Sequence, residues 1–168
     1  MIRQTIIQVA KSFVGQKETA GNSGFVNADF LTKMLKVGWQ KGFAWCSFFA
    51  ELVWTESYKT VDPSKLDDIA TIFSGSAVET FSRFKKAGWK TSANQPEPGD
   101  IVIWRHGDGW QGHAGIVTAV AGNVFQTVEG NTNADGGREG DTVAQKTRKV
   151  GEPFKAKGLN LVGFIKPA

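Results

Sequence analysis

The hydrophobic pattern of this chain changes once, at the turn that runs from Pro96 to Asp100. Upstream of this turn, apolar residues recur every three or four positions, which is the spacing of amphipathic helices. Downstream, short apolar runs rich in Val and Ile are separated by turn residues, which is typical of strands. A chain that forms helices first and an antiparallel sheet afterwards is predicted to be an α+β protein.

The individual elements are predicted from these patterns and from residues that favour helix ends. We predict helices from the N-terminus to Gly15, over 26–36, from Cys46 to Tyr58, and from the capping box Ser76–Glu79 to Ala87. We predict strands over 100–105, 113–120, 124–130, 142–150 and 160–166, with a hairpin turn at Gly122 and Asn123. Residues 16–25 are predicted to be a loop, and residues 59–75 an irregular insertion or a short helix.

The length of 168 residues suits one domain with its own core, so we expect residues 1–168 to form a single catalytic domain and a monomer. No apolar run approaches the length that spans a membrane. Residues 1–11 lack the continuous apolar centre of a signal peptide and fit an amphipathic helix instead. We therefore expect synthesis in the cytoplasm, no membrane insertion, and a different route of export if the protein acts outside the cytoplasm.

The chain carries a mild basic excess, with a net charge of +4 and a pI of about 9.2. Such an excess favours association with polyanions, among them bacterial walls, nucleic acids and acidic membranes. The basic residues cluster at Lys85 and Lys86 and, late in the chain, at Lys146, Arg148, Lys149, Lys155 and Lys157. They are not interleaved with aromatic residues, so we expect a solvated surface and no nucleic-acid partner.

Cys46 is the only cysteine, so it can form neither an internal disulfide nor a thiolate zinc cage. It can be a buried packing thiol or a nucleophile. Its predicted place is the first turn of a helix, where unpaired N–H groups and the helix dipole lower the pKa of a thiol. The same backbone N–H groups, including that of Cys46, can hold the oxyanion of a tetrahedral intermediate.

Two histidines could act as the base for this thiol. His113 begins a predicted strand and His106 lies in a predicted loop, so we expect His113 to be the base. The next predicted strand ends in Glu129 and Asn131, which are two residues apart and would point to the same face. Either side chain could hydrogen-bond the imidazole of His113 and fix its tautomer. Together these are the groups that cysteine-dependent hydrolysis requires.

Each of these residues alone also has a purely structural explanation. Cys46 shares a helical stripe with apolar residues and could belong to the core. His113 could be a hydrogen-bonded interior histidine, and Glu129 and Asn131 could be turn residues before a Gly-rich loop. The presence of all four in one small domain favours the catalytic interpretation.

Four motifs in this order resemble the CHAP (cysteine, histidine-dependent amidohydrolase/peptidase) branch of the NlpC-type cysteine peptidases. They are Ala44–Phe49, Pro98–Val102, Gly112–Val117 and Val128–Thr132, while Gly15–Glu18 and Val162–Pro167 resemble a phage-associated branch with lysin-like members. The resemblance implies a papain-like α+β fold, in which N-terminal helices pack on a C-terminal antiparallel sheet. It also implies that Cys46 is the nucleophile, that His113 is the base, and that Glu129 and Asn131 orient the base.

The resemblance further implies cleavage of an amide bond in bacterial peptidoglycan through a thioester acyl-enzyme. The chain would be an N-acetylmuramoyl-L-alanine amidase or a stem-peptide or cross-bridge endopeptidase, acting at the bacterial cell wall as a phage lysin or a secreted effector. An effector would also have export machinery and an immunity protein as partners. The alternatives are a catalytically idle wall-binding or phage structural module, and a thiol amidohydrolase or acyltransferase with another substrate.

No metal and no cofactor are expected. Some members of the family bind calcium through an acidic loop near the N-terminus, but here residues 16–25 carry only Glu18. The segment that begins at Asn131 matches the start of an EF-hand loop, but its twelfth position is Thr142 instead of a glutamate.

Several tryptophans lie near the motifs and could line a groove for a glycan or a stem peptide. We expect Trp45 and Trp110 to do so, whereas Trp39 and Trp104 could equally be core aromatics. The sequence does not place the loops that would form the remainder of such a groove.

Replacing His113 with alanine should lower the rate of wall hydrolysis by several orders of magnitude, as loss of a triad member generally does. His106→Ala is the matched control and should cost little, because that residue is assigned to a loop. Loss of turbidity in a suspension of bacterial walls measures both rates. If the two variants gave the reverse result, the predicted placement of the strands would be wrong.

Overall fold

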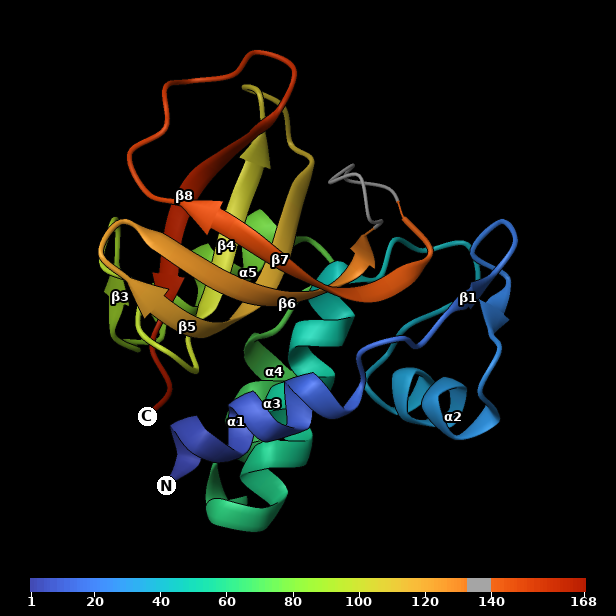
Figure 1. Cartoon of the computed structure of the whole chain (residues 1–168). Helices are drawn as coiled ribbons and strands as arrows, with labels where there is room; N and C mark the ends of the chain where they lie inside the picture. The colour runs from blue at the N-terminus through green and yellow to red at the C-terminus, as the bar shows by residue number, and fades with distance from the viewer. Residues whose placement is uncertain (133–139) are drawn as a thin grey trace.

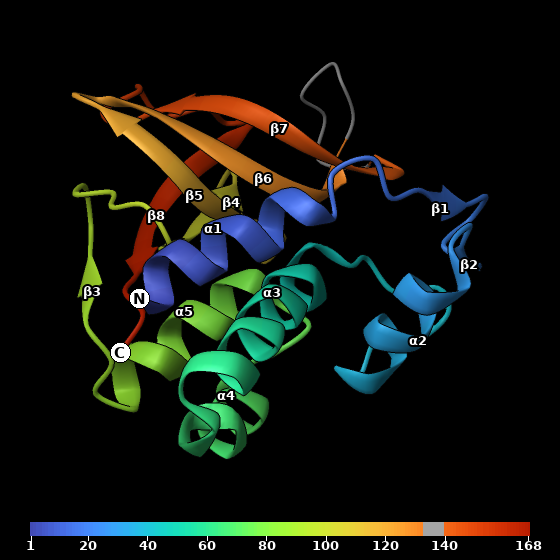
Figure 2. The same ribbon diagram turned by 60° about the horizontal axis from the view of Figure 1, so that its bottom comes forward.

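The computed structural model describes residues 1–132 and 140–168, and its helices precede the strands of its main sheet (Figure 1). The helices of the first half form a layer against one face of a sheet built from the second half (Figure 2). The predicted α+β fold, with helices packed on a C-terminal antiparallel sheet, is confirmed.

The helices are α1 (Ile2–Ser12), α2 (Ala28–Lys36), α3 (Cys46–Val61), α4 (Leu66–Ile72) and α5 (Ala77–Lys86), and a short 3₁₀ helix, η1 (Pro63–Lys65), joins α3 to α4. α2 begins at Ala28 rather than at residue 26, because Asn27 caps it by accepting a hydrogen bond from the Phe30 N–H at 2.9 Å. Ser76 caps α5 as predicted, and accepts from the Glu79 N–H at 3.3 Å. The segment 59–75 continues α3 and then forms η1 and α4, which agrees with the short helix considered for it.

The main sheet contains β3 (Thr91–Ser92), β4 (Ile101–His106), β5 (Gly112–Ala121), β6 (Val124–Thr132), β7 (Thr142–Lys149) and β8 (Leu159–Ile165). The strands lie in the order β3-β8-β4-β5-β6-β7, and all neighbours are antiparallel. The predicted strands correspond to β4 through β8, whereas β3 is too short to show a periodicity. A second sheet, formed by β1 (Glu18–Thr19) and β2 (Gly24–Phe25), lies in the segment that the sequence analysis assigned to a loop.

Both faces of the central strands are buried, which explains the unbroken apolar run of β4. Ile101 and Ile103 belong to the main core beneath the sheet, which they share with the helices. Val102 and Trp104 point to the other face, where they join a second apolar cluster that includes Phe125. The twist of the sheet carries β6 and β7 steeply across β4 and β8 on this side (Figure 1).

α3 is the central helix, with α1 and α5 on either side and β5 and β6 above it (Figure 2). Most of its residues are buried, among them Phe49, Val53 and Trp54, so it lacks the broad polar face of a surface helix. Neither α3 nor any other helix in the described ranges is both long and apolar enough to cross a membrane. The apolar character of α3 therefore reflects its place inside the core.

β6 crosses the first turn of α3 at Gly130, where no side chain would fit. A Cβ atom at this position would lie 2.7 Å from the Cβ of Phe49 and 2.7 Å from the ring of Trp45. Carbon atoms in contact are normally about 3.5–4.0 Å apart. The absence of a side chain at residue 130 therefore lets β6 approach the N-terminus of α3 closely.

Asp100, the residue before β4, ties both ends of the chain to the sheet. Its side chain has no exposed surface and pairs with Arg3 of α1 and with Lys166, which follows β8, each at 2.7 Å. The Glu97 N–H donates a further hydrogen bond at 2.8 Å. A buried carboxylate without partners would be strongly destabilising, so these contacts fix the turn that leads into β4.

Replacing Gly130 with alanine should lower the free energy of unfolding by about 1–3 kcal/mol, the usual cost of overpacking a core. It should also move α3 away from β6 and so reduce wall hydrolysis more than the loss of stability explains. Gly24→Ala is the matched control, because a Cβ there would only be in ordinary contact with Thr19 Oγ1, at 3.4 Å. Urea unfolding and wall hydrolysis, measured for both variants, should separate them clearly; equal effects would contradict the role given to Gly130.

Candidate active site

Cys46 is the first residue of α3 and lies where this helix meets the sheet. Trp45 precedes it as the N-cap residue but provides no side-chain cap, so the N–H groups of the first turn remain available to other acceptors. The indole N–H of Trp45 donates instead to the carboxylate of Glu18, and its ring packs edge-on against Phe25. These contacts fix the backbone just before Cys46. The side chain of Cys46 is itself buried.

His113 lies on β5 and has no exposed surface. Its ring stacks on Trp104, the residue opposite it on β4, with the ring centroids 5.7 Å apart. Its Nε2 atom lies 2.8 Å from Oε2 of Glu129. Its Nδ1 atom has no hydrogen-bond partner among the described residues, and it is therefore the nitrogen left to interact with the thiol of Cys46.

The carboxylate of Glu129 is fully buried and has partners on three sides. Besides the contact with His113, Thr127 donates its hydroxyl to Oε1 at 2.5 Å. Arg148 donates to both oxygens, from Nε at 2.9 Å and from Nη2 at 2.6 Å. Gly115 leaves room for this side chain, because a Cβ there would lie 2.8 Å from the Cγ of Glu129. Of the two residues considered for orienting His113, Glu129 is the one in contact with it.

Arg148 is the residue of this site that the sequence analysis missed, since it was assigned to the solvated basic surface. It lies on β7, opposite Phe125 of β6, and its guanidinium carbon is 5.0 Å from the ring centroid of Trp104. Only 19% of its side chain is exposed, so it is largely covered by its neighbours and is not a freely solvated surface residue. The side chains of β7 alternate between the two faces of the sheet, so the sequence predicts which of them share a face with Arg148. Only the pairing of β7 with β6 shows that this face is the one that carries Glu129.

Asn131 does not share the face of Glu129, contrary to the prediction from a regular strand. The register of β6 against β7 shifts between Glu129 and Thr132, and Asn131 has a φ of +54°. This left-handed conformation is one that asparagine adopts more readily than most residues. Within the described parts of the chain, the side chain of Asn131 makes no hydrogen bond with His113.

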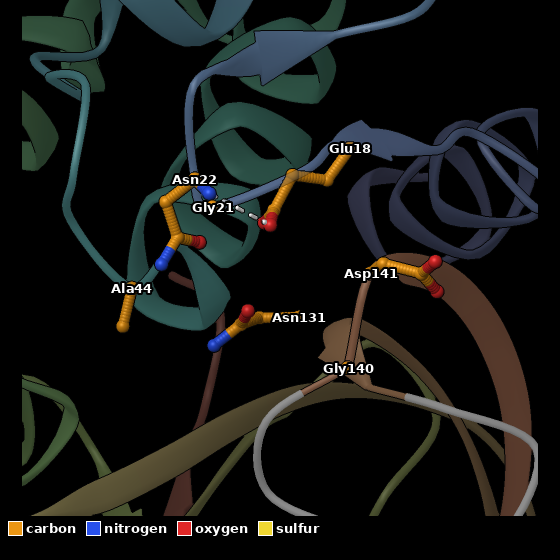
Figure 3. Close-up of a pocket in the computed structure, with 7 residues that line it drawn as sticks. All are labelled: Glu18, Gly21, Asn22, Ala44, Asn131, Gly140 and Asp141. Carbon is orange, nitrogen blue, oxygen red and sulfur yellow. Dashed lines mark hydrogen bonds between the residues drawn. The ribbon is translucent and has the colours of Figure 1, made fainter.

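The side chain of Asn131 borders a hollow of about 390 Å³ beside the N-terminus of α3. The hollow is lined by Glu18, Gly21, Asn22, Ala44, Asn131, Gly140 and Asp141. Figure 3 shows that Glu18 and Asn22, from the hairpin of β1 and β2, approach Asn131 of β6, whereas the carboxylate of Asp141 points away from them. Ala44, which lines the hollow, precedes Cys46 by two residues in the sequence.

The sequence model of the CHAP domain matches residues 38–131, more than half of the chain. The matched range contains Cys46, His113, Glu129 and Asn131. The chain belongs to the CHAP family. CHAP domains are cysteine- and histidine-dependent amidase or peptidase domains of the NlpC and papain-like group.

A solved structure, "The crystal structure of Ly7917", is similar to this CHAP chain. It superposes with a TM-score of 0.55 at 18% sequence identity, and the match covers 98% of this chain and 62% of that one. The likeness supports the predicted papain-like fold. This chain therefore spans less than two thirds of the length of that structure. No curated protein matches the sequence.

The thiol and the imidazole of the CHAP site shift the pKa of each other. Burial raises the pKa of Cys46, but His113 and the N–H groups of Ala114 and Ser47 more than offset this, so the pKa of the thiol lies below its ordinary value. Burial lowers the pKa of His113, but Cys46 and Glu129 together raise that pKa to about 9. Both shifts therefore favour the thiolate and imidazolium over the neutral thiol and imidazole.

The pKa of Glu129 is shifted strongly in the opposite sense. Burial raises this pKa, but Arg148 first and His113 second bring it down to about 2. Between about pH 2 and pH 9, Glu129 is therefore ionised while His113 carries a proton in the folded protein. The charge of the imidazolium is balanced by a carboxylate that does not compete for its proton.

The tryptophans and the second histidine lie in different environments. The prediction that Trp45 lines a groove is wrong, because its side chain has no exposed surface. Trp39 and Trp104 are also buried, which is the core alternative considered for them, and Trp110 is 81% exposed in the turn between β4 and β5. His106 ends β4, where it pairs with Leu159 of β8.

No cluster of three or more metal-binding side chains occurs in the parts of the chain that the structure describes. Glu18, the single acidic residue of segment 16–25, is engaged by Trp45 and by the Asn22 N–H. Most of the EF-hand-like segment after Asn131 lies outside the described residues.

The rate at which iodoacetamide alkylates Cys46 should already be high at pH 6, well below the ordinary thiol pKa of about 8.5, because the thiolate forms beside His113. Above pH 9, near the pKa of His113, the imidazolium loses its proton while the thiolate persists. Wall hydrolysis should therefore fall above pH 9, whereas alkylation should not. Alkylation stopped at set times and followed by mass spectrometry gives the pH profile of the alkylation rate, with glutathione as the control thiol. A Cys46 profile that followed the glutathione profile would contradict the ion pair.

Proposed function

We propose that this CHAP domain, formed by residues 1–168 as one catalytic unit, hydrolyses an amide bond of bacterial peptidoglycan with Cys46 as nucleophile and His113 as base. The observation that carries the proposal is the placement of a thiol at the N-terminus of α3, beside an imidazole that is held by a buried carboxylate. Membership of the CHAP family supports the substrate class. Nothing in the geometry requires a metal for this chemistry, since a thiolate is already a strong nucleophile.

The proposed reaction begins with attack of the Cys46 thiolate on the carbonyl carbon of the amide. An S–C bond forms, and the carbonyl oxygen becomes an oxyanion that the N–H groups of the first turn of α3, including that of Cys46, can stabilise. The intermediate then collapses, the C–N bond breaks, and the imidazolium of His113 gives its proton to the leaving amine. The product of this half-reaction is a thioester on Cys46.

The second half-reaction restores the enzyme. His113, now neutral, takes a proton from a water molecule that attacks the thioester carbon. The C–S bond breaks, the acyl part leaves as a carboxylic acid that gives its proton to solvent, and Cys46 is again a thiolate beside an imidazolium. Glu129 keeps the ring of His113 in one orientation through both steps, because its Oε2 holds Nε2 and leaves Nδ1 for the reaction.

The hollow beside α3 is the proposed site for the part of the substrate that flanks the scissile bond. It adjoins Ala44 on one side and Asn131 on the other, and its polar side chains include the amides of Asn22 and Asn131. Peptide groups of a stem peptide or a cross-bridge can hydrogen-bond to such a lining. Asn131 is then proposed to contact the substrate directly, and Glu129 to orient His113.

We further propose that the protein acts as a phage lysin or a secreted effector, after synthesis in the cytoplasm and export by a partner system. An effector would be held inactive in its producer by an immunity protein. The proposed cleavage sites are the N-acetylmuramoyl-L-alanine bond and the amide bonds of the stem peptide or cross-bridge. These bonds differ in the groups that they release, so digestion products distinguish them.

Cys46→Ala should abolish the release of muropeptides from purified walls, because no other thiol is available, while its unfolding midpoint should change little. Cys46→Ser should also fail, since a serine hydroxyl is far less acidic than a thiol. Mass spectrometry of the digest identifies the bond: a freed lactyl carboxyl indicates an amidase, and a cut within the peptide indicates an endopeptidase.

The controls for this experiment are wild-type protein blocked with iodoacetamide and the His106→Ala variant. Blocked protein should release nothing, and His106→Ala should release products at nearly the normal rate. Wall digestion by Cys46→Ala would overturn the proposed mechanism. If wild-type protein bound walls without releasing products, the chain would be an idle wall-binding module.

A further inference from the structure

The buried carboxylate of Glu129 is shared by two cationic groups that come from opposite sides. His113 reaches it from β5, and Arg148 reaches it from β7. Arg148 forms a bidentate contact, with Nε on one oxygen and Nη2 on the other. Because the Nη2 contact and the His113 contact involve the same oxygen, Oε2, the position of the guanidinium directly sets the place of the atom that orients the imidazole.

Arg148 also touches the other residue that holds His113. Its guanidinium lies over the ring of Trp104, 5.0 Å from the centroid, and Trp104 stacks on the imidazole at 5.7 Å with a tilt of 27°. The same guanidinium therefore fixes one neighbour of the base by hydrogen bonds and the other by stacking. Lysine has neither the planar fork nor the flat face that this double contact needs.

We propose that Arg148 is a positioning residue that keeps Glu129 ionised and directed at His113, and thereby sets the lower pH limit at which Cys46 is reactive. The proposal rests on the proposed function only in taking Cys46 and His113 as the reacting pair. It assigns no contact with substrate to Arg148. The competing explanation is a purely structural ion pair that joins β6 to β7 and leaves the reactivity of the thiol unchanged.

The direction of the expected effect follows from the electrostatics of Glu129. Burial raises the pKa of this carboxyl, and Arg148 is the largest of the influences that lower it. Without Arg148, Glu129 takes up a proton at a higher pH and then no longer balances the imidazolium of His113. The thiolate that depends on this imidazolium is therefore lost at a higher pH as well.

Other charged groups near this pair remain the same in all variants. Glu152, in the loop after β7, acts on Arg148 from outside, and Lys146 faces Thr127 across β6 and β7. Cys46 itself approaches from α3. A shift in the pH profile of Cys46 alkylation that appears only when Arg148 is changed is therefore assigned to Arg148.

The test is the rate of alkylation of Cys46 by iodoacetamide between pH 4 and pH 9, in wild type, Arg148→Ala and Arg148→Lys. In Arg148→Ala, the acid limb of the profile should move up by at least about one pH unit, which is a tenfold lower rate at a pH on that limb. Arg148→Lys restores the charge without the fork or the flat face and should therefore recover only part of the shift. Arg105→Ala, which removes an exposed arginine next to Trp104 in the sequence, is the matched control and should follow wild type.

Thermal unfolding shows whether each variant is folded. If Arg148→Ala alone does not fold, the same change is tested in the Glu129→Gln variant. In Glu129→Gln the carboxylate is absent, so adding Arg148→Ala should leave the alkylation profile as it is in Glu129→Gln alone. A folded Arg148→Ala with the wild-type profile, or a further shift in the Glu129→Gln background, would overturn the proposal.

Alkylation requires no peptidoglycan, so this outcome is independent of the proposed function. A wild-type protein that fails to digest walls would refute the proposed function but would leave the assignment of Arg148 intact. A wild-type protein that digests walls while Arg148→Ala keeps its normal alkylation profile would refute only the assignment.

Discussion

The active site depends on one close approach, the contact of β6 with the first turn of α3 at Gly130. At this point a strand backbone lies directly against a helix, with Phe49 and Trp45 where a side chain would otherwise be. The approach brings a thiol from the helical layer next to groups from the sheet, although the two layers come from different halves of the sequence. Trp45 contributes twice, because its ring forms part of this contact and its indole N–H fixes the chain just before Cys46 through Glu18.

The buried charges of the site alternate in sign from one element to the next. The positive end of α3 meets the thiolate of Cys46, followed by the imidazolium of His113, the carboxylate of Glu129 and the guanidinium of Arg148. Cys46, His113 and Glu129 therefore each have an opposite charge on both sides, which offsets the cost of burying their charges.

Much of the fold could be predicted because its signals are local. The cap at Ser76, the apolar run of β4 and the turn before Asp100 depend only on nearby residues, and the ordered motifs around Cys46, His113 and Glu129 indicated the family.

The features that could not be predicted from the sequence all depend on contacts between distant segments. The two-residue strands exist only through their partners, and the burial of Trp45 depends on Glu18 and Gly130. The left-handed φ of Asn131 accompanies a register shift, and the pairing of β7 with β6 turns Arg148 inward. Strand periodicity alone specifies neither.

The order of the strands determines when the fold can be completed. β8 is the last strand of this sequence, yet it lies between β3 and β4 and not at an edge of the sheet. While the chain is being synthesised, β4 therefore keeps one unpaired edge, and Asp100 lacks one of its two cations, until residues 159–166 are available. The sheet consequently cannot be completed in the order of the sequence, because β8, an interior strand, is made last. An interruption near residue 159 leaves the gap in the middle of the sheet, on the strand that pairs with the one carrying His113.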